Sequence, residues 1–241
     1  MKNWQKAGLA FLAVVLIGGI YLFFVFKSRQ DPGVLGKKNQ EPKLTQDELA
    51  VVRLRYATNF TDAKDALEGK PAWIKAGYTL PYFPYSGGSV QWEKRVGELP
   101  PAVKINITKV IKAVVPAKID DRVAHGIRQY LAVFTIEGTD GTFAAPIGAT
   151  DGPNESILAD ELFYYDPPQK IYDNWPQPTW DAIKAHTPTV GMNELQTRMA
   201  VGAKVETDSQ DAGNRTITYH AGPKTWTVTF YKDKATSVKA S

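Results

Sequence analysis

The side chains that could do acid–base or nucleophilic chemistry are few and scattered. Histidine occurs at His125, His186 and His220, and no two of them have the HExxH spacing that places two imidazoles around a zinc ion. The chain contains no cysteine, which excludes the common structural zinc sites. A Ser–His–Asp triad need not be local in sequence, but no G-x-S-x-G motif supports one. We therefore expect a structural or surface role for each histidine.

Carboxylates occur as adjacent pairs at Asp120–Asp121 and Asp160–Glu161. Paired carboxylates can do acid–base work or hold a cation. Neighbouring residues of a strand point to opposite faces, which separates the members of each pair, and Asp120–Asp121 is typical of a turn. No phosphate-binding loop or dinucleotide fingerprint is present. The sequence thus predicts no catalytic residue, no metal site and no cofactor, and we predict that the protein is not an enzyme.

Aromatic side chains gather in irregular, proline-bearing segments. Such side chains are favoured at protein interfaces because they bury a large area with few rotatable bonds. One alternative is that they plug onto a small core, and another is a sugar-binding face. The residues predicted to contact a partner are Tyr82, Phe83, Tyr85, Phe163, Tyr164, Tyr165, Trp175 and Trp180.

Residues 7 to 26, "AGLAFLAVVLIGGIYLFFVF", contain no charge and no proline. Twenty helical residues span about 30 Å, the thickness of a hydrocarbon core. The run is longer than a signal-peptide core, and "KSRQD" follows it in place of a small-residue cleavage site. We therefore predict a retained single-pass transmembrane helix. Gly18 and Gly19 are expected on a face that another helix approaches closely, with ordinary membrane-helix glycines as the alternative.

Lys and Arg residues are more frequent just after this stretch than before it, a bias that favours a cytoplasmic C-terminal domain. A long C-terminal domain is nevertheless translocated largely regardless of its charge, and the short N-terminal tail suits a signal anchor. We predict a bacterial inner-membrane protein with its folded domain in the periplasm. Its predicted partners are the membrane and other membrane-protein subunits. The net charge of +4 is dispersed, which speaks against nucleic acid.

The chain is predicted to be α+β, with four parts. Residues 1–27 form the anchor, and residues 28–44 are a Pro- and Gly-bearing linker. Residues 45–186 form a small antiparallel β barrel or sandwich behind N-terminal helices, and residues 187–241 form a helix followed by three antiparallel strands. The capping-box pattern at Thr45–Glu48 predicts a helix with Leu49, Val52, Tyr56 and Phe60 on one face, and a second short helix is expected over residues 61–67.

Strands in the middle of the chain are indicated by period-two alternation in residues 103–108 and 130–136. "GTDG", residues 138–141, has the composition of a tight turn. "TWDAIKAH" predicts a short helix with Trp180 and Ile183 on one side. Near the C-terminus, Trp226, Val228 and Phe230 are expected on one face of a hairpin that turns near "KDK".

Residues 190–202, "VGMNELQTRMAVG", predict a short helix in which Leu195 and Met199 are an i,i+4 pair and Gly202 is the C-terminal cap. With the strands that follow, Gly191, Met192, Gln196 and Gly202 resemble the small outer-membrane assembly lipoprotein family, which includes the E component of the β-barrel assembly machinery. The resemblance covers about residues 187–241 and implies a pair of helices on a three-stranded antiparallel sheet and an envelope setting. The lipidated cysteine of the family is absent here. No family is recognised for residues 45–186.

The sequence favours a non-enzymatic, membrane-anchored accessory subunit or scaffold of a larger membrane complex, whether respiratory, photosynthetic, secretory or envelope-assembling. The alternative is an anchored envelope enzyme or a cell-wall or ligand-binding module. A pocket in which His125 or His220 meets Asp121 or another carboxylate at hydrogen-bonding distance would favour this alternative.

Overall fold

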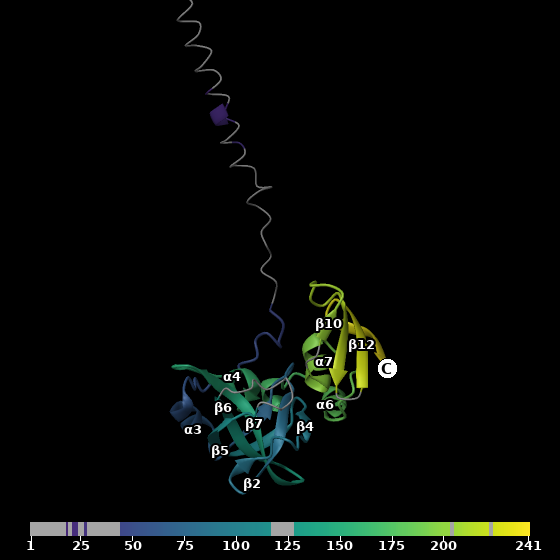
Figure 1. Ribbon diagram of the computed structural model, residues 1–241. Helices are drawn as coiled ribbons and strands as arrows, with labels where there is room; N and C mark the ends of the chain where they lie inside the picture. The colour runs from purple at the N-terminus through teal and green to yellow at the C-terminus, as the bar shows by residue number, and fades with distance from the viewer. Residues whose placement is uncertain are drawn as a thin grey trace, which may run out of the picture. The chain divides into compact units, whose positions relative to one another are not determined.

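The computed structural model describes Gly18, Tyr21–Phe23, Lys27 and residues 44–116, 128–202, 205–221 and 224–241. The chain divides into two units, Met1–Leu49 and Ala50–Ser241. The second unit holds a nine-stranded sheet, called the first sheet, and a four-stranded C-terminal sheet, called the second sheet (Figure 1).

The predicted α+β class with a transmembrane helix is corrected by the structure. Strands account for 42% and helices for 20%, so the protein is mostly β with two antiparallel sheets. In the part of the chain that the structure describes, no helix is long and apolar enough to cross a membrane. The longest of the numbered helices have eight residues, about 12 Å of rise against a hydrocarbon core of about 30 Å. Apart from Gly18 and Tyr21–Phe23, residues 7–26 lie outside the described residues.

The same correction applies to the predicted membrane location. The prediction comprised a single-pass inner-membrane location, a periplasmic folded domain and a helix packed in the bilayer. The finding that overturns them is the same one: no membrane-spanning helix occurs among the residues described.

The first sheet is antiparallel throughout, in the order β3-β2-β7-β6-β5-β1-β9, with β4 paired to β2 and β8 to β7. Its strands are β1 Lys70–Ile74, β2 Leu80–Ser86, β3 Ser89–Val90, β4 Gly97–Leu99, β5 Lys104–Val114, β6 Arg128–Ile136, β7 Thr139–Asp151, β8 Asn154–Ile157 and β9 Phe163–Tyr164.

The central strands of the first sheet show why these residues form strands. In β5 the predicted alternation is confirmed, since Ile105 and Ile107 are buried while Lys104 and Asn106 are half-buried. In β6 every residue from Gln129 to Phe134 is buried, because one face of the strand packs into the main hydrophobic core and the other into a smaller cluster around Phe83. A turn at Glu137–Gly138 joins β6 to β7, with Ile136 paired to Thr139. It lies earlier than the turn predicted at "GTDG", of which only Gly138 is in the turn and residues 139–141 are in β7.

The segment before the first sheet departs from the prediction. The side chains and main chains of Thr45 and Glu48 do exchange capping hydrogen bonds, but they close a single turn, and no helix follows over residues 50–58. The N–H groups of Arg55 and Tyr56 donate instead to the two carboxylate oxygens of Asp160, at 3.0 and 2.8 Å. A helix begins only at α3, Phe60–Leu67, where the side chain of Asn59 caps it.

The remaining helices are α4 Ala159–Leu162, α5 Pro168–Ile171, α6 Gln177–Lys184 and α7 Glu194–Val201. α6 and α7 lie on one face of the second sheet (Figure 1), whose strands run β10-β11-β12-β13. These strands are β10 Val205–Thr207, β11 Thr216–Ala221, β12 Lys224–Tyr231 and β13 Lys234–Ala240. Burial of Trp226, Val228 and Phe230 against the helices confirms the predicted facing of the hairpin, and β10 is a fourth strand that the sequence did not predict.

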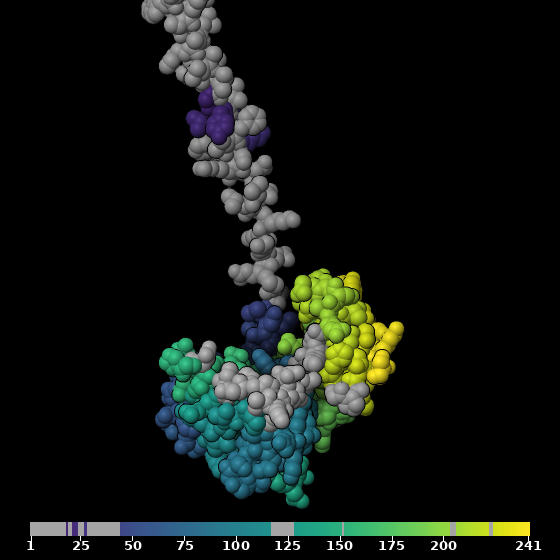
Figure 2. All heavy atoms as spheres, viewed as in Figure 1, coloured from purple at the N-terminus to yellow at the C-terminus, as the bar shows by residue number. Residues whose placement is uncertain are grey.

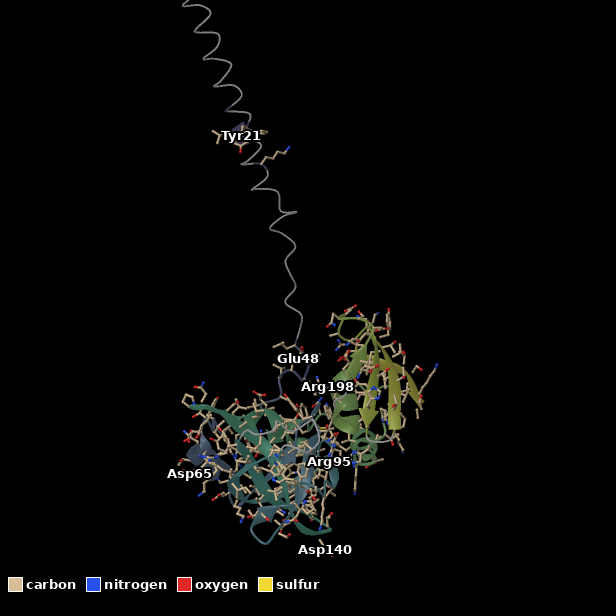
Figure 3. The ribbon with its side chains drawn as sticks, in the orientation of Figure 1. Tyr21, Glu48, Asp65, Arg95, Asp140 and Arg198 are labelled. Carbon is tan, nitrogen blue, oxygen red and sulfur yellow. The ribbon has the colours of Figure 1, made fainter. Side chains whose placement is uncertain are left out.

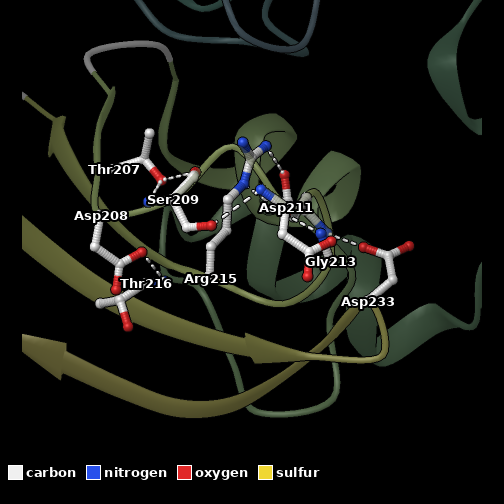
Figure 4. A network of polar contacts seen from close by, with 9 residues as sticks. Thr207, Asp208, Ser209, Asp211, Gly213, Arg215, Thr216 and Asp233 are labelled. Atoms are coloured by element: carbon white, nitrogen blue, oxygen red, sulfur yellow. Dashed lines mark hydrogen bonds and ion pairs between the residues drawn. The ribbon is translucent and has the colours of Figure 1, made fainter.

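A half-buried ion pair between Glu194 and Arg215 fastens α7 to the second sheet. Figure 4 shows Arg215 and Gly213, which contact Glu194 from the loop between β10 and β11. Glu194, in the first turn of α7, accepts hydrogen bonds from Arg215 Nε at 3.0 Å, from an Arg215 terminal nitrogen at 2.5 Å and from the Gly213 N–H at 2.6 Å. The exposed fractions of the two charged side chains are 13% for Glu194 and 19% for Arg215. The first turn of α7 is thereby held on the loop between β10 and β11.

The β12–β13 hairpin turns at Lys232–Asp233, as predicted, and both residues have positive φ, 49° and 55°. This is a type I′ geometry, in which glycine or asparagine normally avoids the strain of a left-handed backbone. We expect Lys232→Gly to raise the free energy of unfolding by about 0.5–1 kcal/mol, measured by urea denaturation. The same change at Lys234, inside β13, should lower it, because glycine weakens a strand; a loss of stability in Lys232→Gly would contradict the expectation.

Candidate functional site

A cavity of about 770 Å³ lies where loop ends of the first sheet meet the C-terminal elements. We call it the histidine pocket. Its volume falls within the range of about 300–1,000 Å³ typical of small-ligand sites. The described residues that line it are Thr79, Arg95, Gly97, Glu98, Pro100, His186, Ala200, Val201, Glu206, His220 and Ala221.

The lining comes from six separate parts of the chain. Thr79 precedes β2, and residues 95–100 run through β4. His186 follows α6, Ala200 and Val201 end α7, and the remaining side chains stand on β10 and β11. Figure 2 shows the C-terminal residues, in yellow-green, beside the teal residues of the first sheet, and Figure 3 places Arg95 on the side of that sheet toward the C-terminal elements. The site is therefore a product of tertiary packing.

His186 occupies a backbone position where glycine is usual. After the last turn of α6, its N–H donates to Ile183 O at 3.0 Å and the Thr187 N–H donates to Ala182 O at 3.0 Å. These are the two hydrogen bonds of a Schellman cap, whose left-handed residue is most often glycine. His186 holds that position with φ of 50°, at a cost of about 1–2 kcal/mol. Strained residues of this kind cluster at functional sites.

A hydrogen bond fixes which nitrogen of His186 can meet a ligand. Nδ1 lies 3.2 Å from the backbone carbonyl oxygen of Ala200. A carbonyl only accepts, so Nδ1 carries the proton and donates, and in the neutral ring Nε2 is left as an acceptor. The cavity therefore has an imidazole acceptor in its wall.

His220 and Glu206 form the second polar group of the pocket. His220 Nε2 lies 3.4 Å from Glu206 Oε1, and His220 Nδ1 lies 3.2 Å from Thr225 Oγ1. The carboxylate accepts from Nε2–H, so in the neutral ring Nδ1 accepts from the hydroxyl of Thr225. The side chains are 37% exposed at His220 and 78% exposed at Glu206, and Oε2 of Glu206 takes no part in this pair. The pair thus offers further acceptor capacity at the mouth of the cavity.

Arg95 and Glu98, which also line the pocket, form an ion pair with 2.8 Å between the Arg95 terminal nitrogen and Glu98 Oε1. The side chains are 27% and 24% exposed. The lining therefore combines this ion pair with the acceptors of His186 and Glu206.

The order of hydroxyl, imidazole and carboxylate at Thr225, His220 and Glu206 resembles the order used in acyl transfer. Thr225, however, is not among the residues that line the cavity, whereas a nucleophile must face the bound substrate. Nor does the described part of the chain bring together three His, Asp or Glu side chains that could hold a metal ion. The arrangement is suited to hydrogen bonding with a bound molecule.

The aromatic residues predicted to contact a partner lie mostly in the interior. The buried ones, between 0% and 8% exposed, are Phe83, Phe163, Tyr164, Tyr165, Trp175 and Trp180. Trp175 stacks between Tyr172, with ring centroids 4.5 Å apart, and Trp180, at 5.0 Å. They fill the space under irregular segments, as the core-plugging alternative expected, and of the six only Trp180 lines either the histidine pocket or the second cavity described below.

The other predicted residues do not gather either. Tyr82 and Tyr85 are half-buried; Tyr82 packs on Phe143, with centroids 5.3 Å apart, and Lys109 covers the ring of Tyr85 at 4.5 Å. Gly18 is exposed, with nothing near the position of an added Cβ. Gly19, like His125 and Asp121, lies outside the described residues.

Among the candidate histidines that the structure describes, His220 is the one that it places beside a carboxylate. Its partner Glu206 lies 14 residues earlier on a short strand that had no pattern to predict it. Arg95, Glu98 and His186 come from loops and caps, where sequence periodicity carries no information. His186 was expected as the last residue of the helix "TWDAIKAH", whereas α6 ends at Lys184 and His186 lies beyond it in its cap.

Local structure accounts for the four residues behind the family resemblance. The Gly191 N–H donates to Ala235 O at 2.8 Å, and Met192 is buried. Gln196 and Asn193 form a capping box at the start of α7, and Gly202 ends that helix. Such turn, core and cap roles arise in unrelated helices, so the resemblance stays a prediction. In the comparisons with known proteins, no family model matches the chain, and neither a curated protein nor a solved structure matches it.

Proposed function

We propose that this protein is a ligand-binding module that holds a small polar molecule in the histidine pocket. The observation that carries the proposal is the convergence of His186, His220 and Glu206 on one open cavity. A pocket in which a histidine meets a carboxylate is the feature that distinguishes this function from a scaffold.

The chemistry of the wall indicates what the ligand must offer. Nε2 of His186 and Oε2 of Glu206 are acceptors, and the imidazole of His220 is engaged by its two neighbours. A ligand that binds here should therefore present several hydrogen-bond donors, as hydroxyl or amine groups do. The hydroxyl of Thr79 can donate to an acceptor of the same molecule.

We infer binding without turnover, because among the described residues no hydrogen bond joins the Thr79 hydroxyl, the one hydroxyl of the lining, to an imidazole or carboxylate that could activate it as a nucleophile. The accessory-subunit function is not carried forward, since six of its eight aromatic contacts are buried.

The test is a thermal-shift screen of the whole chain against a library of small polyols, sugars, amines, amino acids and nucleosides. A ligand at about 100 times its Kd stabilises the folded state by about 2.7 kcal/mol, which raises Tm by roughly 5–10 °C in a domain of this size. We expect at least one compound to do this, and Glu206→Ala with His220→Ala to weaken its binding by about 10- to 100-fold, the value of hydrogen bonds to charged groups.

The control is Glu161→Ala, a change to an exposed carboxylate outside the cavity lining. Its Tm shift with each compound should equal that of the unaltered protein. A library in which no compound shifts Tm would overturn the proposed function, as would a hit whose effect survives the double substitution.

A further inference from the structure

We infer that the histidine pocket is one half of a groove that binds an uncharged oligosaccharide across His186. This rests on the proposed function and extends it from a small polar molecule to a chain of sugar rings. The second half is a cavity of about 480 Å³, which we call the tryptophan pocket.

The two cavities share a wall. His186 lines both of them, and the adjacent residues Pro100 and Pro101 line the histidine pocket and the tryptophan pocket respectively. The two spaces therefore lie on either side of one imidazole and one Pro-Pro step. A ligand long enough to fill one cavity and pass His186 enters the other.

Backbone strain concentrates at this shared wall. Ala102, which lines the tryptophan pocket, has φ of 62°, and His186 has φ of 50°. Positive φ is rare outside glycine, yet two of the five such residues among those described stand here. Hydrogen bonds hold both residues in this conformation. The Ala102 N–H donates to Ile74 O at 2.9 Å, and His186 lies in the two hydrogen bonds of the Schellman cap that ends α6. Strained backbone that the surrounding structure maintains is typical of functional sites, so we take His186 and Ala102 as residues held in place for the ligand.

The tryptophan pocket has an apolar floor and a polar rim. Trp180, Ile183 and Pro101 are buried beneath it. Gln177, whose side-chain N–H donates to Asp181 Oδ1 at 2.8 Å, keeps its amide oxygen as an acceptor on the rim, and Gln169 adds a second amide. A pyranose ring has an apolar C–H face and an edge of hydroxyl groups, and this combination of floor and rim matches it.

The charged side chains that line the groove nearly cancel, which selects against strongly charged polymers: the cations are Arg95, Lys104 and Lys184, and the carboxylates are Glu98, Glu137, Asp181 and Glu206. Lys104 pairs with Glu137 at 3.3 Å in the tryptophan pocket, and Arg95 pairs with Glu98 at 2.8 Å in the histidine pocket. A polyphosphate or nucleic acid would need an excess of cations over carboxylates. An uncharged chain of hydroxyl donors satisfies the acceptors at His186 and Glu206 without disturbing either ion pair.

The experiment is isothermal titration calorimetry of the whole chain with three uncharged series, β-1,4-glucan, β-1,4-linked N-acetylglucosamine and α-1,4-glucan, each from one to six rings. In at least one series we expect Kd to fall about tenfold or more once the chain is long enough to pass His186. Asp181→Ala, on the exposed rim of the tryptophan pocket, should weaken binding of the long oligomers about tenfold and leave the short ones unchanged. The matched control is Asp173→Ala, an exposed aspartate outside both cavities.

His186→Gly separates a binding role from a structural one. It should raise Tm, because glycine relieves the left-handed cap, while it weakens binding of every oligomer length at least tenfold. A variant with lowered Tm, or one with unchanged affinity, would overturn the role of His186.

Affinity that is independent of chain length, no binding in any series, or tighter binding of tetralysine than of any glycan would each overturn the oligosaccharide inference. The proposed function would still stand if a small molecule from the thermal-shift screen binds in the histidine pocket. The proposed function would be overturned only if the thermal-shift screen also failed, that is, if every hit kept its effect in the double variant at Glu206 and His220 or if there were no hit.

Discussion

Glu194→Ala is expected to lower the free energy of unfolding by about 3 kcal/mol, because it leaves the Arg215 guanidinium largely buried without its partner. Glu194 holds three hydrogen bonds that join α7 to the loop before β11 (Figure 4). Its carboxylate is bidentate to the guanidinium, the strongest arrangement for such a pair. Urea denaturation at pH 7 measures the loss.

The control for this prediction is an ion pair on the surface. Arg53 and Asp166 lie 3.2 Å apart with side chains that are 65% and 36% exposed. Exposed pairs contribute about 0–1 kcal/mol, so Arg53→Ala should change the stability by less than about 1 kcal/mol. Equal losses in the two variants would show that the Glu194 pair has no special structural role.

The same carboxylate gives the stability a pH dependence. Burial alone would raise the pKa of Glu194, but the hydrogen bonds from Arg215 and the Gly213 N–H outweigh it and hold the pKa below its ordinary value. A carboxyl whose pKa is lower in the folded state contributes stability above its unfolded pKa, about 4.3, and loses it as the pH falls through the folded pKa. The difference in stability between the unaltered protein and Glu194→Gln should therefore be full at pH 7 and shrink below about pH 4.

Local sequence patterns predicted the elements whose structure depends on residues close to one another in the sequence. The alternation in β5, the facing of Trp226, Val228 and Phe230, and the amphipathic face of α6 all follow from burying one side of a regular element. The helix expected after Thr45 failed for a tertiary reason. The carboxylate of Asp160, more than a hundred residues away, takes the N–H groups of Arg55 and Tyr56 that a helix would have used.

Most of the candidate site could not be predicted from the sequence, because it too depends on tertiary contacts. Its walls come from β4, the ends of α6 and α7, and the strands β10 and β11, and a pattern of local period says nothing about which loops meet. The aromatic clusters were predicted to be exposed, and most of them are buried. Residues in proline-bearing segments were predicted to contact partners, yet Trp175 is buried with its ring stacked on Tyr172 and packed against Trp180. Irregular backbone therefore did not imply exposed side chains.

Gly202→Ala is expected to lower the free energy of unfolding by about 3 kcal/mol and to weaken ligand binding in the histidine pocket. Gly202 ends α7 with φ of 84° and ψ of −150°, a region that is essentially restricted to glycine and costs other residues about 1–3 kcal/mol. An added Cβ would also lie 2.8 Å from Thr79 Cγ2 and 3.6 Å from Pro101 Cδ, and overpacking of this kind costs about 1–3 kcal/mol more.

Gly202→Ala should also change the shape of the histidine pocket, because Gly202 is where the end of α7 approaches the first sheet. Thr79 on one side and Ala200 and Val201 on the other all line the histidine pocket, so pushing Thr79 away from Gly202 widens the cavity. The control is Gly87→Ala, whose φ of 58° is also left-handed but whose Cβ would meet nothing within 4 Å; it should cost only about 1 kcal/mol and leave binding intact. If Gly202→Ala is no more destabilising than Gly87→Ala, α7 does not approach the first sheet closely, and the wall that the two elements share is not rigid enough to hold a ligand.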